Sequence, residues 1–150
     1  MLNFIKNLVT LNGALLNKAR SITAYTEALA FQEANEHDKA LALMIEASEL
    51  GNVQAMSVLG SMYLLGRGVK EDGRQAVAWL QKAIDGGFED AISVLGMAYA
   101  TGKAGIKVDI PKAREMLIFS ADRGDEQSAR MLGMMDRGEG VFRGQKKSRR

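Results

Sequence analysis

The sequence has no cysteine, a single histidine and a single proline, and aromatic residues make up only 6% of it. Without cysteine, disulfides, thiolate metal sites and cysteine nucleophiles are excluded. The one histidine, His37, has no second imidazole with which to build a metal site, so we interpret it as a solvated turn residue. Few prolines together with frequent Ala, Leu, Met and Glu favour an all-helical chain.

Long apolar runs are also missing. The N-terminal stretch MLNFIKNLVTLNGALLNKARS is interrupted by Asn7, Thr10, Asn12 and Asn17. It therefore never approaches the roughly 18 apolar residues that suggest a membrane span. We interpret it as a helix of the mature protein rather than a signal peptide, and we expect no transmembrane segment and a cytoplasmic location.

Charge is unevenly placed along the chain. The net charge is +2, yet without the last ten residues the chain holds 15 basic and 18 acidic residues. We expect residues 137–150 to form a disordered basic tail. The tail has three readings: a solvated end, an arm for nucleic acid or an acidic partner, or an attachment to anionic membrane. The basic residues of its last ten positions are Arg143, Lys146, Lys147, Arg149 and Arg150.

The dominant pattern is an internal repeat of 36 to 37 residues. The pair Leu59-Gly60 recurs as Leu95-Gly96 and again as Leu132-Gly133. Between the first two copies, further positions recur in register: Tyr63 as Tyr99, Gly66 as Gly102, Asp72 as Asp109, and Ala76 as Ala113. Self-similarity of this period predicts a stacked array in which each unit buries its apolar face against its neighbours.

Helical periodicity predicts about seven to eight helices. We expect an N-terminal capping helix within residues 1–19 and a repeat array over residues 20–136. An alternative role for the first helix is to bind a partner or a membrane surface. The expected array helices cover residues 21–34, 38–50, 52–65, 73–85, 88–101, 110–123 and 125–136.

Two residue types predict how the array is built. A mid-helix glycine such as Gly60 costs about 1 kcal/mol relative to alanine, so its recurrence indicates that a neighbouring helix approaches closely. Asp72 stands where it can cap the N-terminus of the helix that follows.

The pattern G-x-x-x-A-x-x-x-L-G-x-x-Y-x-x-G-x-G-V-x-x-D-x-x-x-A-x-x-W resembles the Sel-1-like repeat, a relative of the tetratricopeptide repeat. It is carried by Gly51, Ala55, Leu59, Gly60, Tyr63, Gly66, Gly68, Val69, Asp72, Ala76 and Trp79. Residues 87–124 carry a second copy, and a truncated third copy follows. Residues 20–50 look more like an ordinary tetratricopeptide unit.

The resemblance implies a right-handed α-solenoid in which the first helix of each hairpin lines a concave surface. It also implies a non-enzymatic adaptor or scaffold of bacterial type that binds proteins, and some small members resemble immunity proteins that neutralise a toxin. The residues themselves offer no catalytic constellation and call for no cofactor. Acidic pairs such as Glu71-Asp72 fall at helix starts, where carboxylates favour the helix dipole.

Geometry then suggests where a protein partner binds. If Leu59, Gly60 and Tyr63 face the second helix of their hairpin, the opposite face of each first helix is free for a peptide, helix or toxin domain. The predicted concave-face residues are Tyr25, Leu29, Gln54, Ser57, Ser61, Leu64, Asp90, Ser93, Met97, Thr101, Arg130 and Met134. The alternative is that Leu29, Leu64 and Met97 merely pack against the next repeat.

The last repeat lacks its second helix in the sequence pattern. Its open end also allows two chains to pair as a homodimer. A different kind of function remains as the alternative to protein binding, in which the basic tail binds nucleic acid or anionic membrane and the repeats only carry it.

Overall fold

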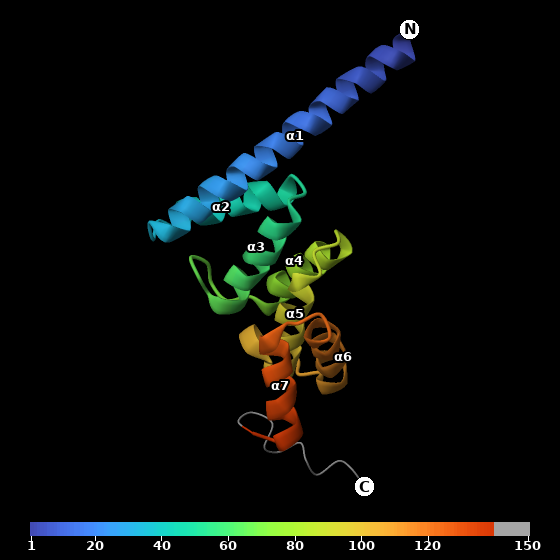
Figure 1. Cartoon of the computed structure of the whole chain (residues 1–150). Coiled ribbons are helices and arrows are strands. Elements are labelled where there is room, and N and C mark those ends of the chain that lie inside the picture. The colour runs from blue at the N-terminus through green and yellow to red at the C-terminus, as the bar shows by residue number, and fades with distance from the viewer. Residues whose placement is uncertain (140–150) are drawn as a thin grey trace.

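A computed structural model describes residues 1–139, and within this range the chain folds entirely into helices (Figure 1). The seven α-helices of the described range are α1 (Leu2–Glu33), α2 (His37–Glu49), α3 (Val53–Leu65), α4 (Gly73–Asp85), α5 (Asp90–Thr101), α6 (Ile110–Ala121) and α7 (Glu126–Arg137). A short 3₁₀ turn, η1 (Lys103–Gly105), lies in the loop before α6. The predicted all-helical fold is confirmed.

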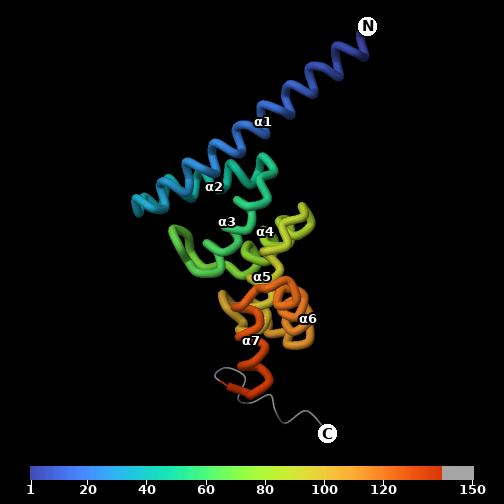
Figure 2. Tube along the Cα trace, in the orientation of Figure 1, coloured from blue at the N-terminus to red at the C-terminus, as the bar shows by residue number. Residues whose placement is uncertain are grey.

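Consecutive helices pack as hairpins that stack along one direction. The pairs α1/α2, α3/α4 and α5/α6 form the hairpins, and α7 packs against α6 as the first half of another. We call α1, α3, α5 and α7 the A helices and the others the B helices. Neighbouring A helices also meet, since α3 contacts α5 and α5 contacts α7. The hairpins stack in chain order, so that α1 and α7 lie at opposite ends of the array (Figures 1 and 2).

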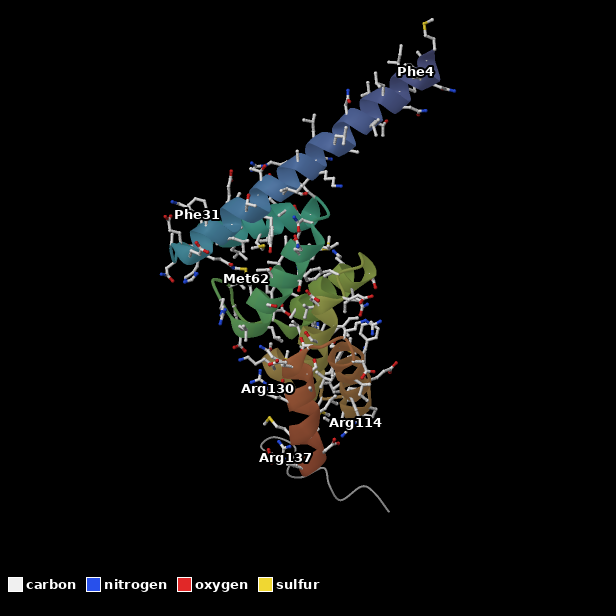
Figure 3. The ribbon with its side chains drawn as sticks, viewed as in Figure 1. Phe4, Phe31, Met62, Arg114, Arg130 and Arg137 are labelled. Carbon is white, nitrogen blue, oxygen red and sulfur yellow. The ribbon has the colours of Figure 1, made fainter. Side chains whose placement is uncertain are left out.

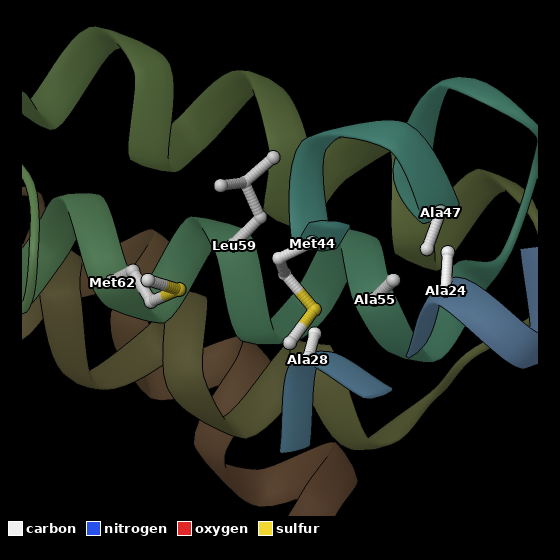
Figure 4. Close-up of a cluster of buried hydrophobic side chains, with 7 residues drawn as sticks. All are labelled: Ala24, Ala28, Met44, Ala47, Ala55, Leu59 and Met62. Carbon is white, nitrogen blue, oxygen red and sulfur yellow. The ribbon is translucent and has the colours of Figure 1, made fainter. Parts of the chain in front are cut away.

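The core is a series of small clusters, each shared between neighbouring hairpins. The first cluster combines residues of α1, α2 and α3, namely Ala24, Ala28, Met44, Ala47, Ala55, Leu59 and Met62 (Figure 4). A later cluster joins Leu80 and Ala83 of α4 to Ala91 and Leu95 of α5. Because each hairpin completes its core only with its neighbour, the fold has the repeat architecture that the sequence predicts.

The two local predictions are confirmed. The Asp72 side chain accepts hydrogen bonds from the backbone N–H groups of Arg74 and Gln75, at 2.9 and 3.1 Å, and so caps α4. A Cβ placed on Gly60 would lie 2.7 Å from Leu80 Cγ and 3.1 Å from the Ala76 carbonyl oxygen. The glycine therefore lets α3 and α4 approach closely.

The N-terminal segment differs from expectation. The predicted break between a capping helix and the first array helix does not exist, because α1 runs unbroken from Leu2 to Glu33. Ser21, expected to start a new helix, instead donates its hydroxyl to the Lys18 carbonyl at 2.8 Å within the helix. Every residue from 1 to 20 is exposed, so this segment projects from the array rather than covering its end (Figure 1).

At the other end, α7 closes at Gly138, which adopts a left-handed conformation with φ of 64° and donates its N–H to carbonyls of the last turn. Arg137 and Gly138, the first two residues of the predicted disordered tail, are thus the last residue of α7 and its cap. The predicted basic residues at 143, 146, 147, 149 and 150 lie outside the described residues.

Candidate functional site

The open face of the array is clearest on α5. Asp90, Val94, Met97 and Thr101 follow one another at spacings of four, three and four residues, which places them on one face of a helix. Asp90 and Thr101 are exposed, and Val94 and Met97 are half-buried. The two flanking faces of α5 are occupied, because Leu95 and Ala98 pack towards the preceding hairpin while Ala100 packs towards α6 and α7.

The same positions are open on the other A helices. In α3 the exposed fraction reaches 45% at Leu65, and in α7 it is 36% at Met134. We call this set the A-helix strip. It comprises Ile22, Thr26, Leu29 and Glu33 of α1, Gln54, Val58, Ser61 and Leu65 of α3, Asp90, Val94, Met97 and Thr101 of α5, and Gln127, Met131 and Met134 of α7.

The strip coincides with part of the predicted surface and corrects the rest. Gln54, Ser61, Asp90, Thr101 and Met134 were predicted and lie on it. Leu29 and Met97 were also predicted and lie on it, but they are half-buried and pack against core clusters. The predicted exposure of Ser57, Leu64 and Ser93 is wrong, since these residues are only 7%, 7% and 6% exposed. Tyr25 is half-buried and packs against the first core cluster.

The reason is a shift of one residue around each helix. Leu64 joins Ala76 of α4 and Ala98 of α5 in a buried cluster, so the alternative that it packs against the next repeat is confirmed. Leu29 and Met97, named in the same alternative, are half-buried and also pack against core clusters that include residues of the next A helix. Its neighbour Leu65 takes the open position instead. Five strip residues were missed for this reason: Thr26, Glu33, Val58, Val94 and Met131.

Arg130, which was also predicted, lies one residue before the strip position Met131. It is the counterpart of Ser57 and Ser93, yet its side chain is 73% exposed. In the described part of the chain no further hairpin follows α7, so a position that is buried in the earlier repeats is open in the last one. Figure 3 shows Arg130 on the outside of α7, with Arg137 at the same end of the array.

Ion pairs between charged side chains join neighbouring helices. Arg20 of α1 contacts Glu46 of α2 through two nitrogens, at 2.6 and 2.8 Å. The hydrogen bond from Arg20 holds the pKa of the Glu46 carboxyl below its ordinary value. One guanidinium nitrogen of Arg114 in α6 donates to Asp136 Oδ1 in α7 at 2.5 Å.

Shallow hollows flank the strip at the starts of the A helices. One of about 560 Å³ is lined by Ile22 and Gln54, and one of about 310 Å³ by Asp90 and Arg123. A hollow of about 800 Å³ lies elsewhere, between the start of α4 and residues 104–107. Within residues 1–139, no group of three or more His, Asp or Glu side chains is placed to hold a metal ion. No helix in that range combines the length and apolar character needed to cross a bilayer.

Comparison with known proteins identifies the architecture. The family model of the Sel1 repeat matches residues 31–52, 53–88 and 90–125. The chain belongs to the Sel1 repeat family. The first match corrects the reading of residues 20–50 as an ordinary tetratricopeptide unit. Sel1 repeats are generally non-catalytic modules that bind other proteins.

Solved structures with the same fold support this assignment. The chain superposes with a TM-score of 0.70 and 30% identity on c5321, a protective antigen of uropathogenic Escherichia coli strains displaying an SLR fold. The superposition covers 82% of this chain and 27% of the c5321 chain. A Sel1 repeat protein from Oxalobacter formigenes superposes with a TM-score of 0.61 and 27% identity. That match covers 69% of this chain and 44% of the Oxalobacter chain. Cysteine rich protein B of Helicobacter pylori shares the fold, with a TM-score of 0.54 and 23% identity. That match covers 76% of this chain and 96% of the Helicobacter chain.

A curated relative extends the family to plants. The chain is 34% identical over 68 residues to the ERAD-associated E3 ubiquitin-protein ligase component HRD3A of Arabidopsis thaliana. The match covers 45% of this chain but spans only 10% of the length of that relative.

Proposed function

We propose that this Sel1 repeat protein is a non-enzymatic module that binds a protein partner along the A-helix strip. The observation that carries the proposal is the recurrence of exposed and half-buried positions on one face of all four A helices, which places polar and aliphatic side chains in register along the array. The family's general role in protein binding supports it.

The composition of the strip indicates the kind of partner. Leu65 and Met134 are exposed aliphatic anchors, and Ser61 and Thr101 beside them offer hydroxyls. A helix or extended peptide with spaced apolar residues fits such a surface, and methionine adapts readily to different partner shapes. Binding of this kind depends little on salt, because apolar contacts are not screened by ions.

Within this proposal the protein acts in the cytoplasm as an adaptor of bacterial type or as an immunity protein that covers a toxin. The c5321 antigen and the HRD3A component share only the repeat with this chain over a minor part of their length, so they do not choose between these roles. Pairing of two chains through the free side of α7 is a further part of the proposal.

The test is affinity capture from a lysate of the native cell, with captured proteins identified by mass spectrometry. Leu65→Glu places a charge on the strip, and Ile118→Glu is its matched control, because Leu65 and Ile118 are 45% and 44% exposed and Ile118 lies on the B helix α6. One stoichiometric protein that withstands high salt, is retained by Ile118→Glu and is lost by Leu65→Glu supports the proposal. Equal retention by both variants contradicts it.

The second candidate function rests on the five basic residues that the last ten residues carry without an acidic one. In that case the tail binds nucleic acid or an anionic surface and the array only carries it. A chain that ends at Glu139 separates the two. Loss of capture on truncation, together with sensitivity to nuclease or to salt, would support the tail.

A further inference from the structure

The projecting part of α1 carries a broad apolar face that no other part of the described chain covers. Its aliphatic and aromatic side chains are between 48% and 70% exposed. They are Leu2, Phe4, Ile5, Leu8, Val9, Leu11, Leu15, Leu16 and Ile22. We call them the α1 apolar face. Figure 3 shows Phe4 at the free end of the helix, far from the array.

This face points away from the array. An α-helix turns by about 100° per residue, so the nine side chains occupy about half of the circumference of α1. The buried residues Ser21, Ala24 and Ala28 mark the side of α1 that packs on the array, and they lie on the opposite side of the helix. Because α1 is one continuous helix, the two directions are fixed relative to each other. A flat surface could therefore lie along the apolar face without meeting the hairpins.

The face is not a docking place for another repeat. Ala55 and Leu59 are the α3 residues that pack on the preceding hairpin, and their counterparts in α1 are Thr23 and Glu27. Both are exposed and polar, so the outer side of the first hairpin is not an apolar stacking surface. Eight of the nine apolar side chains come before Ser21, the first buried residue of α1, and so lie outside the repeat architecture. Only Ile22 lies within the array, where it also belongs to the A-helix strip.

The charges beside the α1 apolar face distinguish between the two remaining occupants, which are an anionic surface and a second copy of this chain. Residues 1–26 contain Lys6, Lys18 and Arg20 and no acidic residue. At about 100° per residue, Lys18 borders one edge of the apolar face and Lys6 borders the other. Arg20 also lies at the second edge, but its guanidinium is paired with Glu46 of α2. Cations along both margins suit an anionic surface, because long basic side chains can extend from an apolar face to charged head groups. A second copy would bring like charges together instead.

The width of the α1 apolar face also favours a lipid surface over a second helix. A helix that pairs with one other helix presents a narrow seam, and this face is about half of the circumference. A bilayer surface covers such a width, since an amphipathic helix lies in the interface with its apolar side about 5–10 Å deep. We propose that residues 2–22 of α1 lie along the surface of an anionic lipid bilayer and hold the repeat array beside it. This goes beyond partner binding, because it places the A-helix strip near a membrane.

The test uses the full chain and vesicles of phosphatidylcholine with 30% phosphatidylserine, about 100 nm across, in a sedimentation assay. Leu8→Glu places a charge in the apolar face, and Thr10→Glu is its matched control on the polar side of the same segment. Both positions are exposed, so neither variant disturbs the array. We expect Leu8→Glu to weaken binding at least about tenfold and Thr10→Glu to weaken it no more than about threefold. Vesicles of phosphatidylcholine alone should bind less of the unaltered protein.

Three results would overturn the proposal. The first is an unaltered chain that stays in the supernatant with anionic vesicles at low salt. The second is an equal loss in both variants. The third is that a chain truncated at Glu139 no longer binds the vesicles while Leu8→Glu still does. That result would assign membrane binding to the tail. If light scattering shows a dimer that Leu8→Glu dissociates and the vesicles bind nothing, the α1 apolar face joins two copies instead.

Discussion

Gly60 and Leu80 lie so close that a single added carbon at Gly60 would sit 2.7 Å from Leu80 Cγ. The equivalent Gly96 is similarly tight, with Met116 Cβ at 3.1 Å from the same built position. The third copy differs, because a Cβ on Gly133 meets only the Arg137 guanidinium, also at 3.1 Å. Within the described residues, one sequence motif thus occupies two environments, one packed against a B helix and one that is not.

The first prediction uses this contrast. Gly60→Ala should destabilise the protein, since overpacking against Leu80 costs about 1–3 kcal/mol and exceeds the gain of about 1 kcal/mol in helix propensity. Gly133→Ala should stabilise it by about 0.5–1 kcal/mol, because the flexible Arg137 side chain can move away. Urea denaturation measures both. A change of the same sign in the two variants would contradict the assignment of close helix packing to Gly60.

A second prediction concerns Ser128, which is completely buried and whose hydroxyl has no hydrogen-bond partner. The equivalent positions in α3 and α5 hold Ala55 and Ala91. Ser128→Ala should therefore raise the free energy of unfolding by about 1 kcal/mol, because it removes an unsatisfied buried polar group. Ser48→Ala is the control, since the Ser48 hydroxyl donates to the Met44 carbonyl at 2.7 Å and its loss should not stabilise. Thermal unfolding of the two variants side by side provides the measurement.

Neighbouring leucines test the position of the A-helix strip. Leu64 is 7% exposed and packs between three helices, so Leu64→Ala should cost about 2–5 kcal/mol. Leu65 is 45% exposed, and Leu65→Ala should change stability by only about 0.5 kcal/mol. Chemical denaturation of the pair decides the register. If Leu65→Ala proves the more costly change, the strip is assigned one residue out of place.

The ion pair that fastens α1 to α2 predicts a pH dependence. Arg20 lowers the pKa of Glu46 below its ordinary value of 4.5. A carboxyl with a lowered pKa in the folded state contributes stability above its unfolded pKa and loses it as the pH falls through the folded pKa. The stability difference between the unaltered protein and Glu46→Gln should therefore be largest near pH 7 and shrink below about pH 4.5. Urea titrations at pH 7, 4.5 and 3 measure it, and a difference that grows towards low pH would contradict the role of this pair.

The sequence predicted the local features of the fold because each depends on nearby residues. Asp72 caps the helix that starts beside it, and the recurrence of Leu59-Gly60 reveals the repeat without knowledge of any contact. The break expected near Ser21 was wrong for a related reason. A serine can cap a helix or donate its hydroxyl back into one, and the choice depends on whether the preceding turn is already helical.

The sequence alone determined that this chain forms stacked helical hairpins, because apolar residues at helical spacing and glycines at fixed offsets leave few other ways to bury them. Tertiary structure alone decided which side of each A helix stays open. Leu64 and Leu65 are chemically identical, and only the contacts of Leu64 with Ala76 and Ala98 make one of them core and the other surface. It also decided that α1 continues past the array, because whether an apolar helix face is buried depends on what lies next to it in space.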